Sequence, residues 1–224
     1  MHKLVSRLPI GFRKSPPAIA QYSWEDLTQA LGYRQFYLVG SDDFANTSPH
    51  FLTETPVDAD SYNRSRQGST DSSTYILEFD YDFDITFGNP ATIAAADLLF
   101  QGTLRAENSA GTGTARAYLH VYVYHYDGST ETELGNLASQ EVTAGALTEK
   151  WIRILMKIPV TEKQFSKGDT LRITVKMYDK QTTGGSTGYG EFYFDPNSTQ
   201  TFTDLYDVTI GSDAFVNVPF KIDI

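Results

Sequence analysis

The sequence predicts an all-β protein: an antiparallel jelly-roll sandwich preceded by an extended N-terminal arm and one short helix. Segment 75–87, YILEFDYDFDITF, alternates apolar and polar residues with a period of two, which is typical of a strand with one buried face. The chain contains about nine or ten strand-like segments in all, separated by turn signals and without interleaved helices. Long strands and long connections favour a jelly roll over an immunoglobulin-like sandwich.

The N-terminal segment has the composition of an arm. Residues 1–22 contain three prolines and a glycine and show no helical or strand period. Ser23 and Asp26 are spaced as in a capping box, and Gly32 is a suitable residue to end the helix. The apolar face of this helix would contain Trp24, Leu27 and Leu31. We therefore expect residues 1–33 to form an arm with a helix and residues 34–224 to form one jelly-roll domain.

The remaining segments are predicted to be strands. Residues 40–74 are rich in Ser, Thr, Asp, Asn and Pro and predict a long loop with one strand near Phe51. Asp127-Gly128 and Lys167-Gly168-Asp169 are turn signals, and the first predicts a hairpin. The expected strands are 35–39, 75–87, 98–107, 115–126, 130–134, 151–160, 170–178, 189–194, 203–210 and 215–224.

Composition excludes several classes of protein. The chain has 224 residues, 40% hydrophobic content and 14 Phe and 14 Tyr, which is enough for a core and argues against disorder. The absence of cysteine excludes disulfide scaffolds, thiolate zinc sites and cysteine nucleophiles. No apolar run approaches the roughly 20 residues of a membrane helix. The basic N-terminus lacks the continuous apolar region of a signal peptide.

The net charge of −10 is divided unevenly along the chain. Residues 1–22 hold Lys3, Arg7, Arg13 and Lys14 and no acid, a balance of +4, so the rest carries −14. Residues 40–88 carry −8 and residues 150–180 carry +5. A chain with such segregated charge can bind copies of itself, whereas a uniformly acidic one would repel them. Four cations on an acidic body do not predict nucleic-acid binding.

The most acidic feature is a ladder on segment 75–87, formed by Glu78, Asp80, Asp82 and Asp84. Carboxylates on one strand face lie about 7 Å apart, so they repel unless they are neutralised. A divalent-cation site and a retaining glycosidase pair are two functional interpretations, but each needs carboxylates that converge from different segments. We favour a solvated face whose acids pair with the basic residues of 150–180.

A tyrosine row on segment 115–126 is the second candidate site. Small aliphatic residues occupy one parity of this segment and look like core, so the other parity faces outward or into an interface. Such a row can contact a partner protein or stack on sugar rings. We favour the interface and keep the glycan platform as the alternative. The row consists of Tyr118, Tyr122, Tyr124 and Tyr126.

No other motif points to chemistry. His120 and His125 have opposite parities on one strand and cannot share a metal there. The glycine-rich segment 184–190 precedes a strand and lacks the helix N-terminus of a phosphate-binding loop. HExxH and P-loop motifs are absent from the sequence. We expect no catalytic residue, no metal site and no cofactor.

Three stretches resemble virion structural proteins of tailed phages and related viruses, in which a jelly roll follows an N-terminal arm. They are PIGFRKSPPAIAQYSW near the start, HYDGSTETELG at 125–135 and IPVTEKQFSKGDTLRITV at 158–175. The resemblance covers about a quarter of the chain. It implies a structural role in a virion and carries over no catalytic residue.

These observations predict a non-enzymatic capsid or capsid-decoration subunit, made in the host cytoplasm and located in the virion. Its expected partners are copies of itself, in a trimer or larger symmetric assembly, and other capsid proteins, without nucleic acid or membrane. The alternatives are a carbohydrate- or receptor-binding β-sandwich module and, third, a glycoside hydrolase. The candidate assembly-arm residues are Arg7, Ile10, Phe12, Arg13, Lys14, Trp24 and Leu27.

Overall fold

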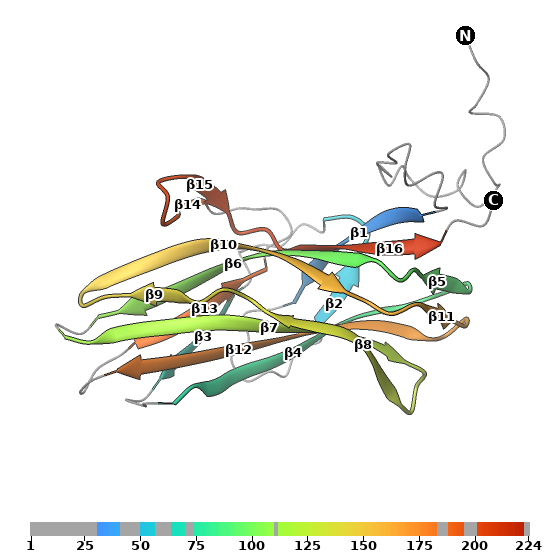
Figure 1. Ribbon diagram of the computed structural model, residues 1–224, viewed down its shortest axis with the longest axis horizontal. Coiled ribbons are helices and arrows are strands. Elements are labelled where there is room, and N and C mark those ends of the chain that lie inside the picture. Colours follow the sequence, from blue (N-terminus) through green and yellow to red (C-terminus); the bar gives the residue numbers. More distant parts are fainter. Residues whose placement is uncertain are drawn as a thin grey trace, which may run out of the picture.

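The computed structural model describes residues 31–40, 50–56, 64–69, 74–109, 112–182, 188–194 and 201–221, with the side chains of 64–69 excluded. Its regular structure in these ranges consists of strands stacked in two layers (Figure 1). This confirms the predicted all-β sandwich. The described residues contain no helix long and apolar enough to cross a membrane.

One layer contains the most regular strands of the chain. Its order is β4, β12, β7 and β8, all antiparallel, with the short β9 paired to β7. β12 lies between β4 and β7 and is paired with both along nearly its whole length. The bounds are β4 (Ile76–Thr86), β7 (Thr114–Tyr126), β8 (Glu131–Ala138), β9 (Val142–Ala144) and β12 (Thr170–Thr182).

The second layer is built around β6, which pairs along one edge with β10 and along the other with β13 and β16. β3 extends the layer beyond β13, and β1 extends it beyond β16. The bounds are β1 (Leu31–Val39), β3 (Arg64–Ser69), β6 (Asp97–Asn108), β10 (Thr148–Pro159), β13 (Gly188–Tyr193) and β16 (Phe215–Lys221).

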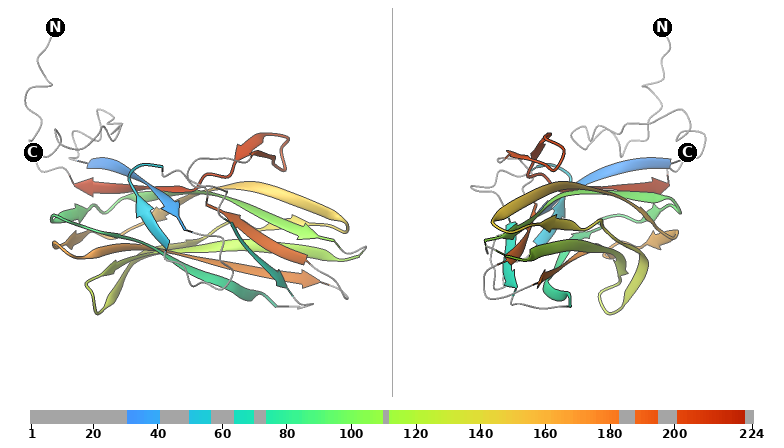
Figure 2. Two further views of the ribbon diagram at one scale, coloured as in Figure 1. Left: turned by 180° about the vertical axis from the view of Figure 1, so that it is seen from behind. Right: turned by 60° about the vertical axis from the view of Figure 1, so that its left-hand side comes forward.

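The two layers are joined at one side by β2 (His50–Thr53), which pairs antiparallel with β1 and parallel with β4. β5 (Ala91–Ile93) and β11 (Lys163–Phe165) form a small pair at one end. β14 (Thr201–Thr203) and β15 (Thr209–Gly211) form a hairpin that projects beside β10, as two views agree (Figures 1 and 2).

Alternation of apolar and polar residues places the core between the layers. On β12, Ile173 and Val175 are fully buried, and on β6, Leu104 is fully buried. Phe192 and Phe194 of the second layer fill the space between them. Burying each such side chain stabilises the fold by roughly 1.5–3 kcal/mol, so the core holds the layers together.

Two predicted turns have the expected chemistry. Gly128 has a φ of +93° and Gly168 a φ of +97°, a backbone region that strongly favours glycine. The Asp127 carboxylate accepts the amide protons of Ser129 and Thr130, both at 2.8–2.9 Å. The β7–β8 hairpin and the entry to β12 are therefore encoded locally, as predicted.

Several predicted elements differ from the structure. β1 begins at Leu31, so Gly32 pairs with Phe220 within a strand and does not end a helix. The loop predicted over 40–74 contains β3, and segment 203–210 contains a turn between two short strands. β3 was missed because RSRQGS has no apolar alternation. The rest of the predicted helix and the arm lie outside the described residues.

Two carboxyl groups meet where β4 and β12 shift register. The partner on β4 changes from Phe79, opposite Met177, to Leu77, opposite Tyr178, so Glu78 is the extra residue of a bulge in β4. β12 itself stays regular, and alternation places Asp179 between the layers, where it is 2% exposed. Its side chain hydrogen-bonds to Glu78 and accepts the amide proton of Gly190 at 3.2 Å. Burial raises the pKa of Asp179 to about 8, and burial also raises the pKa of Glu78. The pair therefore retains a proton in the folded state at neutral pH.

We expect Gly135→Ala to destabilise the fold by roughly 1–3 kcal/mol, because a Cβ at Gly135 would lie 2.2 Å from the backbone carbonyl oxygen of Pro159. Gly88→Ala is the matched control, since a Cβ at Gly88 meets nothing within 4 Å. Urea unfolding measures both variants. Equal stability of the two would show that β8 does not need this close approach to β10.

We expect the stability of the fold to decrease as pH rises from about 4 to about 8, because Asp179 keeps its proton when folded and loses it when unfolded over that range. Asp179→Asn cannot titrate, so its unfolding free energy should vary less with pH. Urea unfolding of both proteins at pH 5 and pH 8 tests this. Parallel pH profiles would contradict a protonated Asp179 in the folded protein.

Candidate functional site

The candidate site is the outer face, defined as the solvent side of β4, β12, β7 and β8. Asp80, Asp82 and Asp84 lie on this side of β4, opposite Lys176, Thr174 and Arg172 of β12. The same residues of β12 lie opposite His120, Tyr122 and Tyr124 of β7. Strand register therefore places an acidic strand, a basic strand and an aromatic strand side by side.

Arg172 is the central cation of the outer face. Its Nε and Nη2 donate to the two carboxylate oxygens of Asp84 at 2.8 and 2.7 Å. Its Nη1 lies 3.3 Å from Asp82 Oδ2 and also donates to Glu131. The guanidinium also lies over the ring of Tyr126, 4.9 Å from its centroid. One side chain thus binds carboxylates from two strands and an aromatic ring from a third.

The rest of the ladder is neutralised in the same way. Lys176 Nζ lies 2.8 Å from Asp80 Oδ2, and the Thr174 hydroxyl donates to Asp82 at 2.6 Å. Partial burial raises the pKa of Asp82, although the bond from Thr174 and the charge of Arg172 oppose this. The predicted pairing of the acidic ladder with basic neighbours is confirmed for Asp80, Asp82 and Asp84. Glu78 is an exception, because it bonds to Asp179.

The tyrosine rings stand in rows and stack on one another. The rings of Tyr122 and Tyr124 are 6.0 Å apart and nearly parallel at 8°. His120 stacks on the other side of Tyr122 at 4.3 Å, and Tyr118 stacks on Tyr178 of β12 at 5.1 Å. Partial burial raises the pKa of the Tyr118, Tyr122 and Tyr124 hydroxyls. Neighbouring rings thus lie against the ring faces of Tyr118, Tyr122 and Tyr124.

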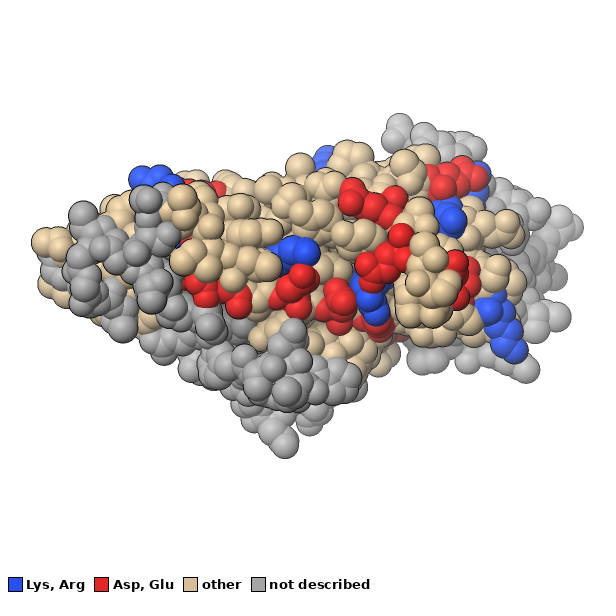
Figure 3. Space-filling model, turned by 90° about the horizontal axis from the view of Figure 1, so that it is seen from below, with Lys and Arg blue, Asp and Glu red and all other residues tan. Residues whose placement is uncertain are grey.

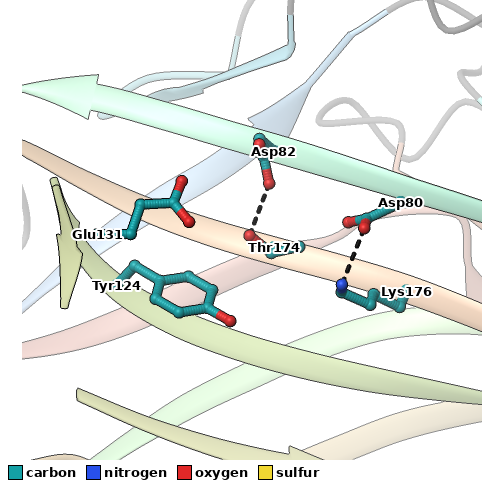
Figure 4. A pocket seen from close by; sticks show the side chains of 6 residues that line it. All are labelled: Asp80, Asp82, Tyr124, Glu131, Thr174 and Lys176. Atoms are coloured by element: carbon teal, nitrogen blue, oxygen red, sulfur yellow. Dashed lines mark hydrogen bonds and ion pairs between the residues drawn. The ribbon is translucent and has the colours of Figure 1, made fainter. Parts of the chain in front are cut away.

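A shallow pocket of about 390 Å³ lies in the outer face (Figure 4). Figure 3 shows acidic and basic side chains alternating across the molecule on this side. The pocket offers three carboxylates and one ammonium group, so its formal charge is negative, and it has hydroxyl donors at its wall. Its lining residues are Asp80, Asp82, Tyr124, Glu131, Thr174 and Lys176.

The histidines of β7 have separate structural roles. His120 Nε2 donates to Asn136 Oδ1 at 2.9 Å, and Tyr122 donates to its Nδ1 at 3.1 Å. His125 is buried on the opposite side and lies 2.7 Å from Asp169 through Nε2. Their opposite positions agree with the sequence parity. Within the described part of the chain, no group of three or more His, Asp or Glu side chains is arranged to hold a metal ion.

Sequence reasoning found some of these residues and missed others. It placed the tyrosines and aspartates on an outward face but did not identify Glu131 or Tyr178 as their neighbours. The missing signal was the register of β8 and β12, which a single sequence does not contain. The seven arm candidates, Arg7, Ile10, Phe12, Arg13, Lys14, Trp24 and Leu27, lie outside the described residues.

A second aromatic cluster, also missed, lies on the outside of the other layer. Trp151 stacks on Phe202 at 3.7 Å, beneath the β14–β15 hairpin. Arg105 lies over Trp151 at 4.9 Å and donates to the fully buried Glu191 at 2.7 Å. These contacts hold the hairpin against β10.

Comparison with known proteins gives no family. No protein-family model matches the sequence, and no curated protein matches it. Solved structures with a similar fold include a CocE/NonD family hydrolase from Staphylococcus aureus, with a TM-score of 0.49 and 12% identity over 85% of this chain and 37% of the hydrolase. They also include an aminopeptidase from a marine sediment Thaumarchaeota archaeon, with a TM-score of 0.45 and 7% identity over 86% of this chain and 37% of the enzyme.

A virus-particle protein is also similar. The VP2 subviral particle of infectious bursal disease virus has a TM-score of 0.34 and 11% identity, over 85% of this chain and 38% of that protein. The chain thus spans 37–38% of the length of these proteins. Their activities and assemblies are therefore not carried over to it, and the resemblance to tailed-phage proteins stays a proposal.

One prediction is corrected by these similarities. The sequence was expected to encode a protein that is not an enzyme, but the similar structures include hydrolases and an aminopeptidase. The exclusion rested on the absence of motifs such as HExxH and overlooked that residues 184–188, GGSTG, match GxSxG. Motifs in this chain do not determine whether its fold occurs in enzymes. The exclusion of enzymes is therefore withdrawn.

We expect Arg172→Met to destabilise the protein by roughly 1–3 kcal/mol, because it leaves Asp82, Asp84 and Glu131 without their shared cation. Arg116→Met is the control: Arg116 is 39% exposed and has one carboxylate partner, Glu141, at 3.2 Å, so its loss should cost less than about 1 kcal/mol. Thermal and urea unfolding measure both. Equal losses would show that Arg172 is not the central cation.

Proposed function

We propose that this chain is a structural virion protein, a capsid or capsid-decoration subunit that binds copies of itself through the outer face and the basic N-terminal arm. The single observation that carries the proposal is that the outer face is ordered by its own contacts. Arg172 and Lys176 hold the carboxylates, and the tyrosine rings hold one another. A tyrosine-rich surface with fixed side chains loses little conformational entropy when a protein binds to it.

Charge supports the arm as the bound segment. The outer face carries Asp80, Asp82, Asp84, Glu131 and Glu133, which outnumber its cations, and its pocket is negative. Residues 1–22 carry +4 and alternate cations with apolar residues. An arm from a neighbouring copy would supply the opposite charge to the carboxylates and apolar contacts to the exposed edges of the tyrosine rings. The resemblance to virion structural proteins with an N-terminal arm favours the same arrangement.

We expect the full-length protein to self-associate and a variant lacking residues 1–30 to dissociate, since deletion removes the four cations that the outer face attracts. Asp80→Asn combined with Asp82→Asn should weaken self-association at least tenfold, a change of about 1.4 kcal/mol. Sedimentation at several concentrations measures both.

Glu141→Gln is the matched control, because Glu141 is a carboxylate of the same layer that pairs with Arg116 and does not line the pocket. It should associate like the parent chain. Unchanged association of the deletion and of the double variant, or a monomeric parent, would contradict the proposal.

A carbohydrate- or receptor-binding module is the second candidate, favoured by the pocket itself. Carboxylates, a hydroxyl and Tyr124 around 390 Å³ are groups that hydrogen-bond to sugars. A glycan array separates the two candidates: binding that is lost in Thr174→Ala and kept in Glu141→Gln would favour the module. Self-association without glycan binding would favour the virion subunit.

A further inference from the structure

The sandwich has an edge strand, β10, whose backbone is open at its centre. Among the described residues, β10 pairs only with β6. The carbonyl oxygen of Trp151 points away from β6, because it accepts the amide proton of Leu205 at 3.0 Å. Along an antiparallel strand, the backbone N–H and C=O groups of successive residues point alternately toward one neighbouring strand and toward the opposite edge. The groups of Arg153, Leu155 and Lys157 therefore point away from β6, like those of Trp151. These groups form an edge to which another strand can pair.

The side chains of β10 determine which kind of strand can pair with its open edge. Leu155 is 71% exposed, although its neighbours Ile154 and Met156 are buried. Arg153 pairs with Asp213 at 2.8 Å, whereas Lys157 forms no ion pair with the described part of the chain. Antiparallel pairing of β10 with β10 centred on Leu155 would place Arg153 opposite Lys157. Because like charges directly opposite destabilise a sheet, this edge favours an acidic strand.

β8 is the acidic edge strand of the other layer. Among the described strands, it pairs only with β7. The Asp127 amide donates to the Thr130 carbonyl, so the backbone groups of Thr130 point toward β7. Because this direction alternates along the strand, the N–H and C=O groups of Glu131 and Glu133 point away from β7. Both side chains lie on the outer face and are exposed. β8 therefore presents two carboxylates beside open backbone groups.

We propose that β10 of one copy pairs antiparallel with β8 of a second copy, with Lys157 opposite Glu131 and Leu155 opposite Glu133. The evidence is the charge complementarity of two open edges whose exposed side chains lie on outer faces. The inference rests on the proposed self-association but uses a different surface from the arm. The Glu131 and Glu133 carboxylates, which already contact Arg172 and Asn136, would gain Lys157 as a further cation.

The two edges lie on the same side of the molecule, and the segments proposed to pair are displaced from each other along the strands. Gly135 of β8 packs against the backbone of Pro159 at the end of β10, and Thr161 donates to the Leu134 carbonyl at 2.9 Å. The proposed pairing places Leu155 level with Glu133, so the second copy is shifted along the strands and the contact is heterologous. The layer that contains β8 would then continue into the layer of the second copy that contains β10, as one contact of a larger assembly.

Disulfide trapping tests the pairing, because the chain has no cysteine of its own. Full-length Leu155→Cys and Glu133→Cys proteins are mixed and oxidised, since paired strands bring Cα atoms within the 4.4–6.8 Å that a disulfide spans. We expect a mixed dimer between the two variants. Leu147→Cys is the matched control, because Leu147 is 72% exposed but lies outside the edge, and it should not cross-link to Glu133→Cys.

Sedimentation of the same samples separates the failure of this inference from that of the proposed function. A cross-linked dimer of Leu155→Cys alone, or equal cross-linking by Leu147→Cys, would overturn the β8–β10 contact. Oligomers without any mixed cross-link would also overturn it and leave self-assembly standing. A monomeric chain without cross-links would overturn both.

Discussion

The structure depends on neutralising the acidic outer side of β4 without burying a charge that lacks a partner. β12 meets this requirement because it lies between β4 and β7 and has two different sides. Ile173 and Val175 on its inner side form the centre of the core, while Arg172 and Lys176 on its outer side bind the aspartates of β4. A shift of one residue in register would turn the inward side chains of β12 outward and the outward ones inward. The packing of the core and the ion pairs of the outer face therefore require the same register.

The sequence predicted the fold from local patterns but could not predict how strands meet. Alternation identified β4, β7 and β12, and glycine turns identified the hairpins, because both signals are carried by neighbouring residues. The assignment of Glu78 to the outer ladder was wrong, since the bulge of β4 at Glu78 depends on pairing between distant segments. Likewise, Tyr178 and Glu131 enter the site through register. β3 was missed because its residues RSRQGS carry no apolar period.

The two sides of the sandwich differ in a way that bears on assembly. On one side, β2 bridges the layers and closes the sheet. On the other side, β8 and β10 approach through Gly135 and Pro159 but retain peptide groups that point outward. Natural proteins commonly protect such edges with charge, and the opposite charges here make each edge selective for the other. The same protein thus has an ordered outer face and a complementary pair of edges.

Electron cryo-microscopy of the full-length protein at a concentration where it self-associates tests the central claim most directly. The account predicts a symmetric assembly in which the outer face of β4, β12, β7 and β8 is covered by a neighbouring copy, with density of the N-terminal arm over Asp80 and Asp82. An assembly in which this face remains open to solvent, or a protein that stays monomeric at every concentration, would contradict it.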